Sequence, residues 1–496
     1  MADTKKDTFW LPLFVIVVGA FAAILNNSSL NVAIPRFMTI FGVGTEKIQW
    51  VLTAYTLTSG VVIPVTGYLG DRFGTKRIFI ISMAIFTSGS ALCALAWSAD
   101  AMILFRIWQG IGGGAILPTS MTIIYRLVPR EKIGLALGVW GMAAFMGPAI
   151  GPTLGGYIVD NFDWRFLFLV NLPVGLLAIA LSALLLQEGP RKPGLHLDKW
   201  GFIFSTAGFF TLLLALSQGP REGWGSFDVV MLFVIAFYCL LVFVIVELST
   251  PEPMIDLRLL KNRTFTASVI IGSLITVGLF GGVFLIPLFT QTLMGMTPYQ
   301  TGLMLMPAAL VTGFMMPVSG FLFDRIGARP LGLVGLTITA ACTWELHKLT
   351  MCTGASYITA LMVVRALGMG LAMMPITTAG MNTVPLPMVG RASSLNNVFR
   401  QVSASFGIAV LTAVMQNRHW VHLAHLADAV TQFSPALMPG GDWYGAAGQE
   451  FLPLLAGLVQ KQALVLALDD TFIVASLFIF LALPLLLLLS PPGRGA

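Results

Sequence analysis

Long stretches without a charged residue constrain this chain more than any other feature. Residues 264–323 contain no Asp, Glu, Lys or Arg over 60 positions, whereas a helix crosses a bilayer with roughly 20 apolar residues. Only 10% of the 496 residues are charged, against about 25% in soluble domains. An aqueous protein core cannot bury this much apolar surface, so the sequence predicts an all-helical integral membrane protein.

Stretches of this length recur along the sequence and predict fourteen transmembrane helices. Within 264–323, the turn at 295–298 separates two of them. Residues 417–470 are predicted to form a long outer loop, with an amphipathic helix at 451–468 that lies against the outer face. The predicted spans are 9–33, 48–69, 77–97, 101–125, 133–158, 165–187, 199–218, 228–247, 264–289, 300–322, 331–350, 356–380, 392–416 and 471–490.

Lys and Arg predict the orientation, because cytoplasmic loops carry an excess of both residues. With the N-terminus inside, the inner segments contain 18 of the 28 Lys and Arg, and the outer segments contain 7. The remaining three, Arg106, Arg365 and Arg400, lie within spans. This bias predicts an even number of spans in the inner (plasma) membrane, with both termini in the cytoplasm.

An internal repeat relates the two parts of the chain. Residues 64–74 and 317–327 are identical at seven of eleven positions, and each copy ends a span and enters an inner loop. A second similarity between the two parts relates Arg106 in span four to Arg365 in span twelve. A tandem repeat with one membrane orientation implies two similar bundles related by an axis along the membrane normal, with a substrate site between them near the midplane.

The repeat also predicts the domain organisation. If the halves begin at spans one and nine, six spans complete each half. Residues 1–190 then form an N-terminal six-helix bundle, and residues 191–250 form two inserted transmembrane helices between the halves. Residues 251–496 form a C-terminal six-helix bundle with the long outer loop 417–470.

The two copies of the repeat predict a gate on the inner face. Their glycines allow close helix contact and a tight turn, and Asp71 can pair with Arg72 or Lys76 or face a helix N-terminus. A positive-inside anchor would explain the basic residues but not the repeated Gly-x-x-x-Asp-Arg-x-Gly frame. The predicted gate consists of Gly67, Asp71, Arg72, Gly74, Arg77, Asp324, Arg325 and Gly327.

Span five combines a small-residue face with two prolines. Glycines every four residues favour tight helix packing, and proline removes a backbone hydrogen bond and kinks a helix. Close packing alone requires the glycines but not the prolines, so we interpret this span as a bend that moves. The residues are Gly147, Pro148, Gly151, Pro152 and Gly155.

Polar side chains within spans predict the pathway for substrate and protons. A charge at the depth of Arg106 costs about 2.5–3.5 kcal/mol, so this residue should face the bundle interior, either on the pathway or as a structural hydrogen-bond hub. Asn26 and Asn27 point in different directions on a helix, so one of them is predicted to be structural. The predicted pathway residues are Asn26, Asn31, Arg106, Gln109, Glu345, Arg365 and Arg400.

Two residue clusters have more than one explanation. The methionines around spans nine and ten, with Met373 and Met374, are compatible with a promiscuous pocket or with lipid-facing packing. His419, His422 and His425 do not share one helix face, and their spacing is not typical of metal ligands. We predict a solvated helix there, with no metal site and no cofactor in the chain.

Several motifs resemble the major facilitator superfamily, and within it the fourteen-span drug:proton antiporters of the EmrB/QacA type. Residues 67–77 resemble the signature of the loop between spans two and three, 106–110 the signature of span four, and 147–156 the antiporter signature. Residues 164–175 and 400–407 also fit this subfamily. The resemblance covers essentially the whole chain and implies a major facilitator fold of two six-helix bundles plus two inserted helices.

The chain departs from this family in span one. The family signature has an Asp where this sequence has Asn26. An amide does not titrate, so proton coupling cannot be carried over to this position. Glu345, toward the outer end of span eleven, is the most embedded alternative, although it can also pair with Lys348. Asp469 and Asp470 border the last span.

The resemblance implies a secondary active multidrug efflux transporter that works by alternating access in the lipid bilayer. Its ligands are a small lipophilic substrate and, as coupling ions, protons. A facilitator or importer without proton coupling stays open, as does a metabolite exporter that works with a periplasmic membrane-fusion adaptor protein. We predict no enzyme, because the spans lack paired carboxylates and a phosphate loop. The scattered Lys and Arg argue against a nucleic-acid partner.

Overall fold

The computed structural model describes residues 9–189, 191, 192, 194, 198–429 and 446–489. All regular secondary structure in this part of the chain is helical. The N-terminal helices are α1 (Trp10–Phe41), α2 (Thr45–Phe73), α3 (Thr75–Ala94), α4 (Ala99–Leu127), α5 (Ile133–Asn161), α6 (Phe166–Leu169) and α7 (Asn171–Leu185). They are followed by α8 (Lys199–Glu222), α9 (Phe227–Ser249), α10 (Arg263–Val283), α11 (Leu285–Thr292), α12 (Pro298–Ile326), α13 (Ala328–Glu345), α14 (Ala355–Met381), α15 (Val389–Ala429) and α16 (Ala446–Leu485).

Polar residues in the short connections define where several helices begin. The Ser98 hydroxyl accepts a hydrogen bond from the backbone N–H of Ala101 at the start of α4. Thr297 and Gln300 form a reciprocal capping box at the start of α12, which has Pro298 as its first residue. Such caps satisfy backbone donors that the first helical turn leaves without partners.

The helices are compatible with fourteen transmembrane spans. Within the described residues, twelve helices are long and apolar enough to cross a membrane, and the bent helix α5 makes a thirteenth. Helix α13, with 18 residues, is the remaining long helix and is not among them. The predicted count of fourteen is therefore compatible with the fold, and α13 is the span with the weakest individual signal.

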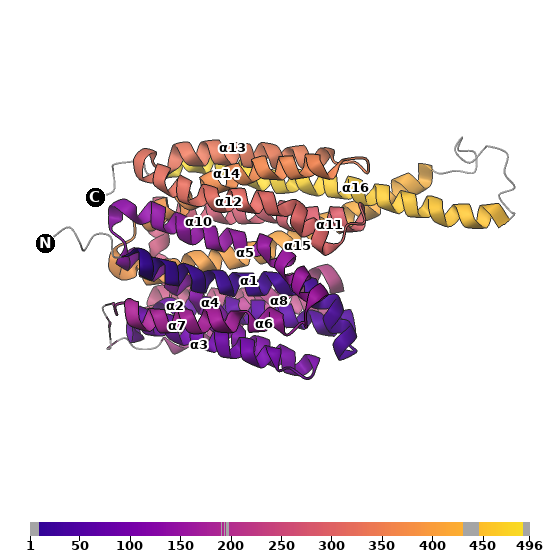
Figure 1. The fold of residues 1–496 in the computed structure, drawn as a ribbon. Coiled ribbons are helices and arrows are strands. Elements are labelled where there is room, and N and C mark those ends of the chain that lie inside the picture. The colour runs from indigo at the N-terminus through magenta and orange to yellow at the C-terminus, as the bar shows by residue number, and fades with distance from the viewer. Residues whose placement is uncertain (1–8, 190, 193, 195–197, 430–445, 490–496) are drawn as a thin grey trace.

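The helices form two packed groups, one above the other in Figure 1. Helices α1–α7 lie in the lower group and α10–α16 mostly in the upper one. Contacts between the groups run mainly from α5 to α12 and from α2 to α15. Helix α8 packs on α2, on α15 and on α9, so the inserted pair contacts a helix of each group.

The buried apolar residues show that the two groups are joined more firmly at one end. One cluster contains residues of both groups, among them Phe79 and Met316. At the other end the residues divide into one cluster per group, represented by Phe37 and Phe289. The joined end also contains the start of α1 and the end of α16 (Figure 1). We call it the inner end, following the orientation predicted from Lys and Arg.

The segment predicted as a long outer loop is mostly helical. Helix α15 continues to Ala429 and α16 begins at Ala446, while residues 430–445 lie outside the described part. The two helices project together beyond the bundle (Figure 1), so 451–468 does not lie against the outer face as predicted. The helices pack on each other instead, and His422 Nε2 lies 2.8 Å from Asp470 Oδ2.

Candidate transport site and inner gate

A narrow cavity lies between the two groups of helices, lined by α4, α5, α10, α14 and α15. Its free volume is about 20 Å³, enough for about one water molecule. Ligand sites typically have 300–1,000 Å³, so a drug-sized molecule requires the groups to separate. The lining residues are Met121, Trp140, Phe145, Val269, Gly272, Ser273, Met373, Met374, Thr377, Asn396, Asn397 and Arg400.

The cavity contains three of the residues singled out in the sequence. Arg400, Met373 and Met374 line it together. Trp140, Asn396 and Asn397 were not predicted, although an amide pair one helical turn before Arg400 was a usable signal. The Trp140 indole donates to the Ser120 hydroxyl at 2.9 Å, which fixes its ring in the cavity wall.

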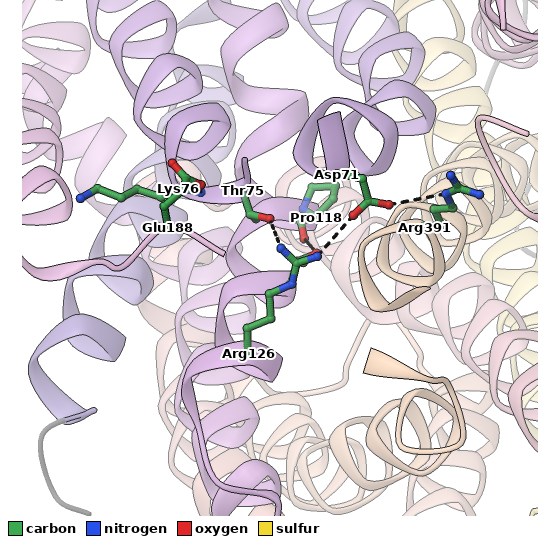
Figure 2. A network of polar contacts seen from close by, with 8 residues as sticks. Asp71, Thr75, Lys76, Pro118, Arg126, Glu188 and Arg391 are labelled. Atoms are coloured by element: carbon green, nitrogen blue, oxygen red, sulfur yellow. Dashed lines mark hydrogen bonds and ion pairs between the residues drawn. The ribbon is translucent and has the colours of Figure 1, made fainter. Parts of the chain in front are cut away.

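An ion-pair network at the inner end joins the two groups of helices (Figure 2). Asp71, near the end of α2, is 3% exposed. Its Oδ1 lies 3.3 Å from Arg126 Nη2 on α4, and its Oδ2 lies 3.6 Å from Arg391 Nε on α15. Arg126 also donates to the Thr75 hydroxyl at 2.6 Å. The carboxylate thus neutralises one cation from each group.

Asp71 also lies at the start of α15, because α2 and α15 approach each other closely. A Cβ on Gly67 would lie 2.8 Å from the Gly390 carbonyl oxygen, so only glycine fits this crossing. A carboxylate near a helix N-terminus is stabilised by the helix dipole. Asp71 therefore lies near a helix N-terminus, as one of the two expectations had it, and within the described residues its ion pairs are with Arg126 and Arg391 and not with Arg72 or Lys76.

The other basic residues of the first repeat serve other contacts. Arg72 donates to the Tyr68 hydroxyl at 2.6 Å, Lys76 donates to the Ala183 carbonyl at 2.7 Å, and Arg77 is exposed. The segment after α7 crosses the network, where the backbone N–H of Lys192 donates to the Asp71 carbonyl at 2.9 Å. The connection between α7 and α8 is therefore attached to the residue at the centre of the ion-pair network.

The second repeat forms a related contact, with no ion pair among the described residues. Asp324, near the end of α12, accepts hydrogen bonds from the backbone N–H groups of Gly134 and Leu135 at the start of α5. Arg325 stacks over Phe321, 4.3 Å from the ring centroid. Each repeat aspartate thus contacts the start of a helix of the other group, Asp324 by accepting backbone hydrogen bonds and Asp71 through its ion pair with Arg391. Asp71 is buried between two arginines, whereas Asp324 is exposed.

Both repeats end their helix at a glycine with a positive backbone angle. Gly74 ends α2 with φ 100°, and Gly327 ends α12 with φ 80°. Side chains other than glycine rarely adopt these angles. The last glycine of the repeated frame therefore fixes the turn that follows each aspartate.

Arg106 lies outside the cavity, in a network within the N-terminal group. It is fully buried on α4 and donates to Val51 O at 3.0 Å, to Gln109 Oε1 at 2.6 Å and to Asn27 Oδ1 at 3.0 Å. Gln109 donates in turn to the Ser90 hydroxyl at 2.6 Å. These oxygens accept hydrogen bonds from all three nitrogens of the guanidinium, which favours the interpretation of Arg106 as a structural hydrogen-bond hub.

Arg365 occupies the equivalent position in the C-terminal group. Its Nε donates to the Thr343 hydroxyl at 2.9 Å, and its Nη2 donates to Gly278 O, also at 2.9 Å. Neither Arg106 nor Arg365 forms an ion pair within the described residues. Both are held by neutral oxygens, and neither lines the cavity.

The polar residues of α1 face separate surroundings. Asn26 is buried and accepts a hydrogen bond from Asn171 Nδ2 at 2.7 Å, while its own Nδ2 has no partner among the described residues. Asn31 is exposed. The structure therefore places neither asparagine beside Arg400.

The carboxylates considered as proton carriers lie toward the outer end. Glu345 is paired with Lys348 at 2.9 Å, with 36% of its side chain exposed. Asp470 is paired with Arg418 at 3.4 Å and contacts His422. Asp469 differs from both, because its Oδ1 is buried without a hydrogen-bond partner in the described chain.

Helix α5 shows the bend that its prolines predict. Its two segments, on either side of residue 149, meet at 43°. Pro152 lacks the N–H that would bond the Pro148 carbonyl, and the Ser28 hydroxyl of α1 donates to that carbonyl at 2.9 Å. A Cβ on Gly155 would lie 2.4 Å from Ser29 O, so the glycine face packs directly on the α1 backbone.

Two helical groups around a central cavity, with inner ends closed by a repeated motif, define a multi-pass membrane transport protein. The family model of the Major Facilitator Superfamily matches residues 16–408. The chain belongs to this superfamily, whose members transport small substrates across membranes. Its family and fold are those of transporters.

Similar proteins agree with this assignment. An uncharacterized MFS-type transporter, YhcA of Bacillus subtilis (strain 168), is 38% identical over 85% of this chain and 80% of its own length. The multidrug export protein EmrB of Haemophilus influenzae is 30% identical over 96% of this chain and 95% of its own length. The proton:xylose symporter XylE has a similar fold, with a TM-score of 0.60 at 13% identity over 97% of each chain.

Proposed function

We propose that the protein is a secondary active efflux transporter of the inner membrane, with both termini in the cytoplasm. It exports amphipathic small molecules in exchange for protons by alternating access. The observation that carries this proposal is the cavity between two bundles whose inner ends are joined by contacts of two aspartates at equivalent positions of the repeat. Bundles related in this way expose a central site to one side at a time when they rock about it.

The ion-pair network of Asp71, Arg126 and Arg391 stabilises the closed state of the inner end, as such a cycle requires. Arg391 and Arg126 belong to different groups of helices and share Asp71, so separation of the inner ends breaks an ion pair. A charge left without its partner in a buried site is strongly disfavoured, which favours the closed inner end until another interaction offsets the loss. The similarity to relatives named as multidrug export proteins supports the proposal that this protein exports varied substrates.

Proteoliposomes with an imposed pH gradient test the proposed exchange. Lipophilic cations, neutral drugs and organic anions are added in turn while a lumenal dye reports pH. We expect at least one substrate to dissipate the gradient only when protein is present. A variant with Asp100→Asn, which removes an exposed ion pair with Lys47, serves as the control and should behave like the wild type.

The same experiment separates antiport from facilitation. Substrate movement that is fully independent of proton flux would show a facilitator or importer, and the proposal of proton exchange would be wrong. Because Asn26 replaces the expected acid, this outcome has a definite structural explanation.

The proton site requires a titratable group, for which Glu345 and Asp469 are the proposed positions. Glu345 is held by Lys348, whereas Asp469 has a buried oxygen without a partner. We expect Asp469→Asn or Glu345→Gln to abolish substrate-driven proton movement while exchange of labelled for unlabelled substrate continues. Full proton coupling in both variants would exclude both positions.

The projection of α15 and α16 supports a membrane-fusion adaptor as a partner. It extends beyond the bundle (Figure 1) and exposes Trp420 by 69%, Leu454 by 67% and Leu458 by 58%. Trp420→Glu combined with Leu454→Glu should leave transport in proteoliposomes intact but reduce export in cells that contain the adaptor. Unchanged export in such cells would contradict the partnership.

A further inference from the structure

The charge of the cavity is set by one residue, Arg400. Within the described chain the lining contains this guanidinium and no carboxylate. Asn396 and Asn397 lie one helical turn before it on α15, and Ser273 and Thr377 add hydroxyl groups from α10 and α14. Asn397 already donates to the Ser393 carbonyl and Thr377 to the Met373 carbonyl, so Arg400, Asn396 and Ser273 supply the open donors, and the polar part of the cavity is positively charged.

Arg400 is half-buried and, unlike the buried Arg106, Arg365 and Arg391, has no partner among the described residues. Arg391 pairs with Asp71, and Arg106 and Arg365 are held by neutral oxygens. In the described chain Arg400 forms neither a hydrogen bond nor an ion pair, and no carboxylate acts on it electrostatically. A guanidinium stays protonated in proteins and carries five donors, so this half-buried cation in the cavity wall is open to oxygens and a counter-charge from a ligand.

The remaining wall of the cavity is apolar and adaptable. Met121, Met373 and Met374 contribute flexible thioethers, and Trp140 and Phe145 contribute aromatic surface. Methionine packs against varied apolar shapes, and aromatic faces accept planar rings. A ligand that fits both parts has an apolar ring or chain at one end and an anionic group at the other.

We propose that amphipathic organic anions are the substrates of this cavity, with Arg400 binding their carboxylate or sulfonate group. This inference rests on the proposed export function and specifies the charge of its substrate. Arginine matches the planar carboxylate with two parallel hydrogen bonds. Asn396 supplies a further amide donor one helical turn away on α15, and the thioether and aromatic wall holds the apolar part.

Three naphthalene compounds of nearly equal size test the charge preference. They are 2-naphthylacetate, its primary amide and 2-(2-naphthyl)ethylamine, which carry −1, 0 and +1 charge at neutral pH. Binding to the purified full-length protein in nanodiscs is measured by equilibrium dialysis without any gradient. We expect the wild type to bind the carboxylate about tenfold or more tightly than the amide, and the amine most weakly.

Variants of Arg400 identify the residue responsible. Arg400→Gln should raise the Kd of the carboxylate about 10- to 100-fold and change that of the amide less than about threefold, because the amide makes no ionic contact. Arg400→Lys should retain part of the preference, since it keeps the charge but loses the planar pair of donors. Arg418→Gln, at an outer arginine with 52% of its side chain exposed, is the control and should bind all three like the wild type.

Thermal unfolding of each variant shows that it is folded before binding is compared. The proposal is wrong if the wild type does not bind the carboxylate most tightly, or if Arg400→Gln weakens all three compounds equally. Because no gradient is used, either result leaves proton-driven export standing. Binding of the anion without any proton movement in proteoliposomes would contradict the proposed function alone.

Discussion

Asp71 and Asp324 occupy equivalent positions in the two repeats but have different surroundings. Asp71 is buried between Arg126 and Arg391, whereas Asp324 is exposed and accepts only backbone N–H groups. Loss of a charged hydrogen-bonded contact costs about 1.5–3 kcal/mol, and burial makes the cost larger for Asp71. The two residues therefore contribute unequally to the closed inner end.

The first prediction compares Asp71→Asn with Asp324→Asn. Asp71→Asn removes the counter-charge of two arginines, so we expect export to fall by about tenfold or more. Asp324→Asn should reduce it by about threefold or less, because a side-chain amide oxygen still accepts from the backbone. Reaction of a cysteine at Ser394, which is buried beside Asp71, with a thiol reagent from the inner side should accelerate only with Asp71→Asn. Equal loss in both variants would contradict the asymmetry.

The surroundings of a single residue were predictable where its own chemistry and its depth in a span determine them. A buried charge must find oxygens, and Arg106 and Arg365 both do. The partners of Asp71 were not predictable, because Arg391 is 320 positions away and only the packing of α2 on α15 brings it near. For the same reason the sequence indicated Arg400 and Met373 separately but not the cavity that joins them.

Helix α5 is the element that contacts both groups most extensively. One face carries Gly147, Gly151 and Gly155 against α1, and the other carries Gly138 against Met316 of α12. Its proline bend lies between these contacts and is supported by the Ser28 hydroxyl. A helix with small residues on both faces can slide and rock with little steric cost, which suits it to transmit motion between the bundles.

The second prediction concerns the α1 face of α5. Gly155→Val places a side chain where a Cβ already lies 2.4 Å from Ser29 O, so overpacking should lower the free energy of unfolding by about 1–3 kcal/mol. Export should fall with it. Gly457→Val is the matched control, because no atom lies within 4 Å of a Cβ at that position on α16. Equal thermal stability of both variants would show that the close contact is not present in the membrane.

Elements were predicted best where the apolar pattern is uninterrupted. The bend of α5 follows from its prolines, and the positions of the spans follow from the charge-free stretches. The outer end of α15 was assigned to a loop because its sequence mixes polar and apolar residues, and the helix predicted at 451–468 was wrongly placed against the outer face. Those residues pair across two helices, as His422 does with Asp470, and such pairing leaves no long charge-free stretch.

The whole molecule has its two helical groups joined at the inner end. The apolar cluster is continuous there and divided at the outer end, while the central cavity is too narrow for a drug-sized ligand. A complete cycle therefore requires the inner ends to separate and the outer ends to approach each other. The superfamily assignment and the repeat support this motion.

Distances between paired spin labels test this claim most directly. Labels at Arg77 and Arg325, both exposed at the inner end, report on the inner gate, and labels at Asp100 and Tyr357 report on the outer end. The four cysteines are first replaced, and the distances are measured in nanodiscs at two pH values, with and without substrate. We predict that a condition that lengthens the inner distance shortens the outer one in the same sample. Distances that stay constant, or that lengthen together at both ends, would contradict alternating access.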